Sequence, residues 1–146
     1  MVDCSELKLR FEQGDLHWPA VALQSLEAAS PGKALEWATS IFLKVLSYPE
    51  FATNGELQKA RLELVGAIEV KNYILWKSKS EHMWNKNQLY KALSNLYAAF
   101  YFFGISNSKM YRWHIEAAVW LLGTHEVFAD NFTTIMADVC SECNCN

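Results

Sequence analysis

The chain has 146 residues, of which 51% are hydrophobic and 14% aromatic, and its formal net charge is −3. This much apolar material suffices for the core of one domain, which argues against intrinsic disorder and against a need for stabilising disulfides or metals. Six glycines and three prolines are too few for a turn-rich β-sandwich. The longest apolar stretch, residues 96–105, is shorter than the roughly 20 residues of a membrane span, so we expect a soluble domain.

The first third of the chain predicts three segments. Residues 7–11 alternate apolar and basic side chains with the period of a strand, but a lone strand has no partner, so we expect a short helix or an extended arm. A helix is expected over residues 19–29, because proline is favoured at the first helical position. A second helix is expected over residues 32–47, with Ser30 as its N-cap.

The middle of the chain predicts two long helices separated by a polar stretch. Asn54 is a suitable N-cap for a helix over residues 55–76. Residues 77–86 are polar, which is typical of a loop or of the frayed start of a helix. Residues 87–103 are apolar nearly all round, so we expect them to form the central helix of a bundle. The side chains expected in the core are Leu93, Leu96, Phe100, Phe103 and Trp120.

Two further helices are expected in the last third. Ser106 or Ser108 can cap a helix over residues 109–122, and Thr124 can cap a helix over residues 125–139. The whole pattern predicts an all-α fold, a compact bundle of six to seven helices.

Residues 1–139 are expected to form a single helical domain, and residues 140–146 a cysteine-containing C-terminal tail. The tripeptide Lys-Ala-Leu opens two of the expected helices, at residues 33–35 and 91–93. This weak internal similarity leaves open a duplicated helical hairpin.

Charge is segregated along the chain, and segregated charge is more informative about partners than about fold. Residues 71–112 carry seven basic side chains and one acid, a net of +6, whereas residues 1–70 have a net of −4 and residues 113–146 a net of −5. Half of the twenty aromatic residues lie in the basic segment. We therefore expect a charge-polarised surface that docks a protein partner. The candidate contact residues are Lys71, Trp76, Lys77, Lys79, Trp84, Lys86 and Lys91, with Trp76 and Trp84 expected to be exposed.

The same basic aromatic segment supports an alternative partner. Lysines neutralise phosphates and aromatic rings stack on bases, so residues 71–91 are a candidate contact for nucleic acid within a larger assembly. The overall acidity, with a pI of 5.8, argues against an autonomous nucleic-acid-binding protein.

The C-terminal cysteines support a third hypothesis, a metal- or redox-responsive module. The spacing Cys140-x-x-Cys143-x-Cys145 places three thiols together, with Cys4 as a further candidate ligand for a soft metal. A closed zinc site normally draws on two separated ligand pairs, which this cluster lacks. The alternatives are a reduced tail or a disulfide, such as one from Cys4 to a tail cysteine. The N-terminus lacks the basic and apolar regions of a secretory signal, so we expect a cytoplasmic protein.

No catalytic constellation stands out in the sequence. No serine lies in a nucleophile elbow, no glycine-rich loop precedes a helix, and the four histidines are scattered. We therefore expect no catalytic residues, no cofactor and no bound metal. The leading hypothesis is a non-enzymatic interaction protein, such as an adaptor, an inhibitor or a small subunit.

Overall fold

The structure is a computed structural model that describes residues 2–70, 76–83 and 87–142. Within these residues the backbone forms nine α-helices and one 3-10 turn, with no strand, which confirms the all-α prediction. The helices are α1 (Cys4–Glu12), α2 (Ala20–Ala29), α3 (Lys33–Leu46), α4 (Gly55–Val70), α5 (Trp76–Met83), α6 (Gln88–Gly104), α7 (Ser108–Gly123), α8 (Glu126–Asp130) and α9 (Phe132–Glu142), with the 3-10 turn η1 at Pro49–Phe51.

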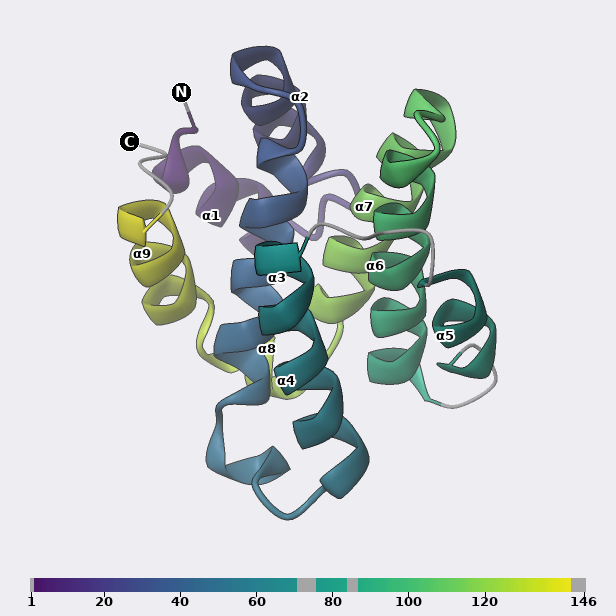
Figure 1. Cartoon of the computed structure of the whole chain (residues 1–146). Coiled ribbons are helices and arrows are strands. Elements are labelled where there is room, and N and C mark those ends of the chain that lie inside the picture. The colour runs from purple at the N-terminus through teal and green to yellow at the C-terminus, as the bar shows by residue number, and fades with distance from the viewer. Residues whose placement is uncertain (1, 71–75, 84–86, 143–146) are drawn as a thin grey trace.

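Helix α3 joins the two halves of the bundle (Figure 1). It packs against α2, α4, α6, α7 and α9, whereas α6 packs mainly on its chain neighbours α5 and α7. The central position expected for residues 87–103 therefore belongs to α3, although α6 is buried over most of residues 89–100. Along α3 the buried side chains are Ala34, Leu35, Trp37, Ala38, Thr39, Ile41, Phe42, Val45 and Leu46.

The start of α3 is fixed by a glycine and by a carboxylate from α2. Gly32 adopts φ +83°, a left-handed backbone conformation that is unfavourable for residues with a Cβ atom. The Glu27 carboxylate accepts hydrogen bonds from the backbone N–H groups of Gly32 (3.0 Å) and Ala34 (3.3 Å). Ser30 was expected to cap this helix, but its side chain does not, since Glu27 reaches the free N–H groups across the tight turn.

The described part of the polar stretch, residues 77–83, is helical, which agrees with a helix rather than a loop among the two alternatives, and α5 packs closely on α6. The Ser80 hydroxyl donates to the Ser94 carbonyl (2.8 Å), and the Ser94 hydroxyl donates to the Ser80 carbonyl (2.7 Å). These two small side chains, bonded in this reciprocal way, and the buried Trp76 ring hold α5 against α6 without a continuous apolar stripe along α5. This explains why hydrophobic periodicity did not predict α5.

Two other N-caps differ from those expected. Asn107, not Ser106 or Ser108, accepts the hydrogen bond from the Met110 N–H (3.2 Å) at the start of α7. His125 Nδ1 accepts from the Val127 N–H (3.2 Å) at the start of α8, in place of Thr124. The single helix expected over residues 125–139 is divided at Asn131 into α8 and α9.

The two ends of the described chain lie side by side (Figure 1) and are covalently joined. A disulfide links Cys4 in α1 to Cys140 in α9, across 136 residues of sequence. On the same two helices, the Phe11 ring of α1 stacks on Phe132 of α9 with centroids 4.3 Å apart, and it meets Phe128 and Trp18 edge-on. Residues 7–11 are thus helical, and α1 is held to the C-terminal helices by both covalent and aromatic contacts.

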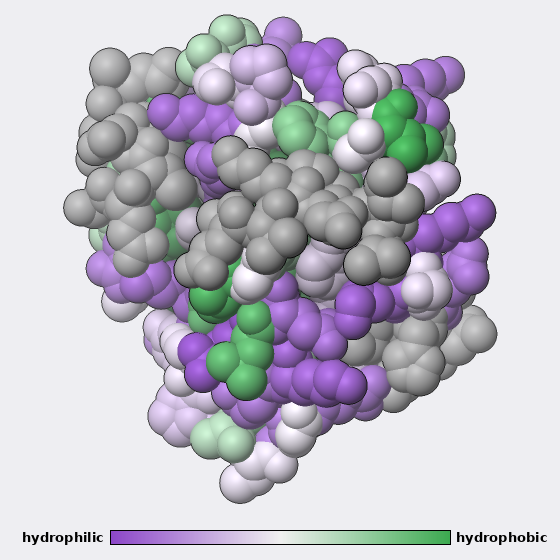
Figure 2. Space-filling view, in the orientation of Figure 1, coloured by the Kyte–Doolittle hydropathy of each residue, from purple (hydrophilic) through white to green (hydrophobic). Residues whose placement is uncertain are grey.

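Three of the five predicted core residues are fully buried and two are not. Leu93 and Leu96 have no exposed surface and Phe100 is 1% exposed, whereas Phe103 and Trp120 are partly buried at the edge of the core. On the face shown in Figure 2, hydrophilic residues predominate and hydrophobic ones form small separate patches. Every helix in the described part of the chain is too short or too polar to span a bilayer.

We predict that Gly32→Ala destabilises the protein by about 1–3 kcal/mol, since a side chain is strained at this φ. A Cβ at this position would also lie 2.9 Å from the Phe103 ring. The matched control is Gly66→Ala in the interior of α4, where a Cβ meets no atom within 4 Å. Alanine favours the helix there, so this variant gains up to about 1 kcal/mol. Urea unfolding measures both, and equal effects would contradict the prediction.

We predict that the Cys4→Ser/Cys140→Ser double variant still folds but loses about 3–5 kcal/mol of unfolding free energy. The covalent link restricts the unfolded chain over 136 residues, and the loss of such a restriction favours unfolding. Chemical denaturation checks the change, and wild type measured in a thiol reductant serves as the control. Identical stability of the oxidised protein and the variant would contradict the prediction.

Candidate partner-docking groove

The structure places the predicted contact residue Trp76 in the core. Its side chain is 6% exposed, and its ring lies on those of Tyr97 and Phe100 with centroids 5.0 and 5.3 Å apart. The expectation of an exposed indole is wrong for Trp76, because α5 turns this face toward α6. Lys71, Trp84 and Lys86, which were also predicted contacts, lie outside the described residues.

The described lysines of the basic segment have different surroundings. Lys77 is exposed, with Nζ 5.8 Å from the centroid of the Tyr101 ring. Lys79 Nζ lies 2.9 Å from a Glu63 carboxylate oxygen, so an acid of the first half of the chain offsets this charge. Lys91 is half-buried on α6. The segregation of charge in sequence is thus only partly retained at the surface.

The cysteines do not form a metal site in the described structure. Cys4 and Cys140 are bonded to each other, and Cys140 is 2% exposed. Cys143 and Cys145 lie outside the described residues. Over the part of the chain that is described, no group of three His, Cys, Asp or Glu side chains is placed to hold a metal ion.

A hollow of about 290 Å³ lies between the loop before α2 and the outer face of α7. We call it the Trp113 groove; it is lined by Leu16, His17, Trp113, Glu116, Ala117 and Trp120. The four lining positions on α7 follow the helical spacing that places side chains on one face. The opposite face of α7 is buried through Tyr111, Ile115, Ala118, Val119 and Leu122.

Two large apolar side chains of this groove are exposed to solvent. Leu16 is 60% exposed and Trp113 is 59% exposed, whereas Trp120 is half-buried against the core. Single exposed apolar residues are ordinary on protein surfaces, but here two line the same hollow. Tryptophan in such a setting is the residue type most enriched among energetically dominant contacts of protein interfaces.

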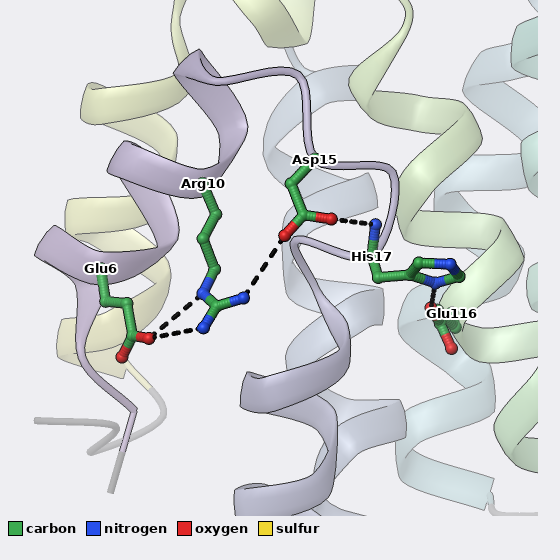
Figure 3. Close-up of polar contacts among 5 residues, drawn as sticks. All are labelled: Glu6, Arg10, Asp15, His17 and Glu116. Carbon is green, nitrogen blue, oxygen red and sulfur yellow. Dashed lines mark hydrogen bonds and ion pairs between the residues drawn. The ribbon is translucent and has the colours of Figure 1, made fainter.

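Polar contacts hold the loop wall of the groove to α1 and α7 (Figure 3). Arg10 of α1 pairs with Glu6 (2.9 Å) and with Asp15 (3.3 Å). The other Asp15 carboxylate oxygen accepts from the His17 backbone N–H at 2.9 Å. His17 Nδ1 then lies 2.7 Å from a Glu116 carboxylate oxygen on α7. The loop residue Leu16 is therefore held between two fixed points.

The carboxylate of Glu116 gives the groove one acidic edge. Its hydrogen bond and charge raise the pKa of His17, and Asp15 adds to this effect. Among the lining residues that the structure describes, no serine or cysteine accompanies His17 and Glu116. The arrangement suits binding: an apolar hollow, an aromatic wall and an adjacent negative charge.

The groove was not predicted from the sequence. Its partners His17 and Glu116 are separated by 99 residues, and no local pattern reports such a contact. The spacing of Trp113, Glu116, Ala117 and Trp120 was the available signal, since it places two tryptophans on one helical face. Without the fold, that face is indistinguishable from a buried one.

We predict that His17 titrates above the ordinary histidine value of about 6.5, and that Glu116→Gln returns its pKa toward that value. Because the folded-state pKa is raised, the stabilisation is complete below pH 6.5 and disappears as pH rises through the folded pKa. NMR titration of the His17 ring measures the first effect. Unfolding of wild type and variant should differ at low pH and converge at high pH, and a constant difference would contradict the assignment.

Comparison with protein-family models, with curated proteins and with solved structures finds no match for this chain. The feature with the clearest chemical meaning is the Trp113 groove, in which apolar exposure, shape and charge coincide.

Proposed function

We propose that this chain is a non-enzymatic interaction domain that docks a segment of a partner protein in the Trp113 groove. The observation that carries the proposal is the exposure of Leu16 and Trp113, 60% and 59%, on the walls of one hollow. Covering these two side chains removes apolar surface from water, which favours association. The polar contacts of Arg10, Asp15 and His17 hold the loop wall in place before binding and so lower the entropic cost of docking.

The edge of the groove indicates the chemistry of the partner segment. Glu116 lines the apolar hollow with its carboxylate 2.7 Å from His17 Nδ1, and His17 is neutral above its pKa. A partner residue with an apolar side chain therefore fits the hollow, and a neighbouring lysine or arginine fits Glu116 in competition with His17. Such a charged contact at a rim contributes more to orientation and association rate than to affinity.

This proposal moves the docking surface from the basic segment to the outer face of α7. The burial of Trp76 and the pairing of Lys79 with Glu63 weaken support for a docking or nucleic-acid surface over residues 71–91. The proposed groove has the carboxylate of Glu116 at its edge, so we expect it to favour a cationic partner segment.

The cellular compartment is a separate part of the proposal. The Cys4–Cys140 disulfide is typical of an oxidising compartment, which counts against the cytoplasmic location expected from the sequence. Trapping free thiols in source cells before lysis would decide between an oxidising compartment and the cytoplasm. A cytoplasmic protein would show Cys4 and Cys140 reduced.

The docking proposal is tested by selecting random peptides on the immobilised protein and counter-selecting on Trp113→Ala. We predict that the selected peptides pair an apolar residue with lysine or arginine. Trp113→Ala should weaken the binding of these peptides by about 2 kcal/mol, or about thirtyfold in affinity. Glu116→Gln should reduce the preference for the cationic residue, because it removes the negative charge and keeps an acceptor oxygen for His17. Isothermal calorimetry measures each affinity.

The matched control is Leu62→Ala, which removes a side chain of similar exposure, 66%, from α4 rather than from the groove. It should leave peptide affinity unchanged. Peptides that bind the Trp113→Ala variant as tightly as wild type would refute docking in the groove. Binding that Leu62→Ala weakens equally would place the docking surface elsewhere.

A further inference from the structure

A second pocket lies where α4 faces the α5–α6 hairpin, away from the Trp113 groove. We call it the Tyr97 pocket. It encloses about 290 Å³ and is lined by Glu56, Lys59, Ala60, Glu63, Ser78, Lys79 and Tyr97. Apart from Tyr97 and Ala60, the five lining side chains are charged or carry a hydroxyl. The lining is therefore chemically unlike that of the apolar Trp113 groove.

The Tyr97 hydroxyl is buried without a partner in this pocket wall. The residue has no exposed surface, and within the described structure its oxygen makes no hydrogen bond. The Nε1 of Trp76, whose ring stacks on Tyr97, is also without a partner. Burying a hydroxyl without a hydrogen bond costs free energy that a phenylalanine at the same position avoids. An unpartnered group of this kind indicates a ligand or an internal water as its natural partner.

The charges around the hydroxyl determine what it can bind. Burial raises the pKa of Tyr97, and the carboxylates of Glu63 and Glu56 raise it further. The hydroxyl therefore remains protonated at neutral pH and acts as a donor to an acceptor oxygen. Tyr97 lines the pocket together with both of these carboxylates.

The lining carries both signs of charge in equal number, two carboxylates and two ammonium groups. The Lys79 ammonium already lies 2.9 Å from Glu63, and this ion pair connects α5 with α4. A ligand of a single charge would leave like charges facing it. A ligand that carries an ammonium and a carboxylate matches both pairs, and the small volume favours a molecule of few atoms.

We propose that the Tyr97 pocket binds a small zwitterion of the α-amino acid class. The Tyr97 hydroxyl donates to the ligand carboxylate, which also lies near Lys59. The ligand ammonium lies near the carboxylates of Glu56 and Glu63, and Ser78 supplies a further hydroxyl. A ligand held in this way contacts α4, α5 and α6 together, and so adds to the Lys79–Glu63 ion pair between α5 and α4.

The Tyr97→Phe variant is expected to lose ligand affinity without losing stability. If the hydroxyl has no partner in the free protein, its removal leaves the melting temperature unchanged or raises it. The same removal weakens ligand binding by about tenfold or more, because a donor to a carboxylate is lost. A residue with a purely structural hydrogen bond would show the opposite: a lower melting temperature and no change in binding.

The experiment titrates free l-α-amino acids one at a time into the full-length protein by calorimetry, with the corresponding amine and the corresponding carboxylic acid as single-charge probes. Saturable one-to-one binding of an amino acid, with much weaker binding of both single-charge probes, supports the proposal. The matched control is Tyr101→Phe, which removes a hydroxyl four positions along α6 from a residue that does not line the pocket. It should leave the affinity unchanged.

Three outcomes would overturn the proposal. The first is that no amino acid binds, which leaves the pocket to water. The second is that an amino acid binds wild type and Tyr97→Phe equally, which places its site elsewhere. The third is a clear fall in the melting temperature of Tyr97→Phe, which shows that the hydroxyl already has a structural partner.

Discussion

The carboxylate of Glu27 holds the helix against which most of the bundle packs. It accepts from the N–H groups of Gly32 and Ala34 and from the hydroxyl of Tyr111, so a single side chain of α2 connects the start of α3 with α7. Hydrogen bonds to an ionised acceptor at a helix N-terminus are stronger than neutral ones, because the free N–H groups carry partial positive charge. The contact also sets the direction in which α3 enters the core between α2, α4, α6, α7 and α9.

The position of α7 determines where the groove lies. Its buried face, from Tyr111 to Leu122, is fixed on one side by Glu27 and on the other by packing against α6 and α3. The outer face, with Trp113 and Glu116, then lies toward solvent. The loop at Leu16 lies beside this face and forms the other wall of the groove. That loop depends in turn on α1, which the disulfide and the Phe11–Phe132 stack hold against α9. The groove therefore depends on contacts between the first and last parts of the chain.

The fold could be predicted to the extent that local signals determine it. Helix starts at Pro19 and Asn54 and the apolar run of α6 were legible, because capping and periodicity act over a few residues. Helix α5 was less clear, since it is held by contacts with another helix: the Ser80–Ser94 hydrogen bonds and the packing of Trp76 on Tyr97. The candidate site was missed for the same reason: Trp76 and Trp113 are both tryptophans near charged residues, and only tertiary packing buries the first and exposes the second. Composition along the chain could indicate a charged surface but could not place Glu63 beside Lys79.

Where a sequence agrees with its fold at every level, departures from that agreement are informative. This bundle satisfies its backbone with caps, buries a continuous core and ties its ends together, yet it keeps Trp113 in water and the Tyr97 hydroxyl without a hydrogen bond. Each of these is unfavourable in the free protein, and each would be relieved by a partner of matching chemistry: an apolar side chain for the first, an acceptor oxygen for the second. Neither the Trp113 side chain nor the Tyr97 hydroxyl takes part in the Glu27 hydrogen bonds that hold the start of α3. The elements that stabilise the fold and the elements proposed to bind are thus largely separate, so that Trp113→Ala and Tyr97→Phe can alter binding without removing the contacts on which folding depends.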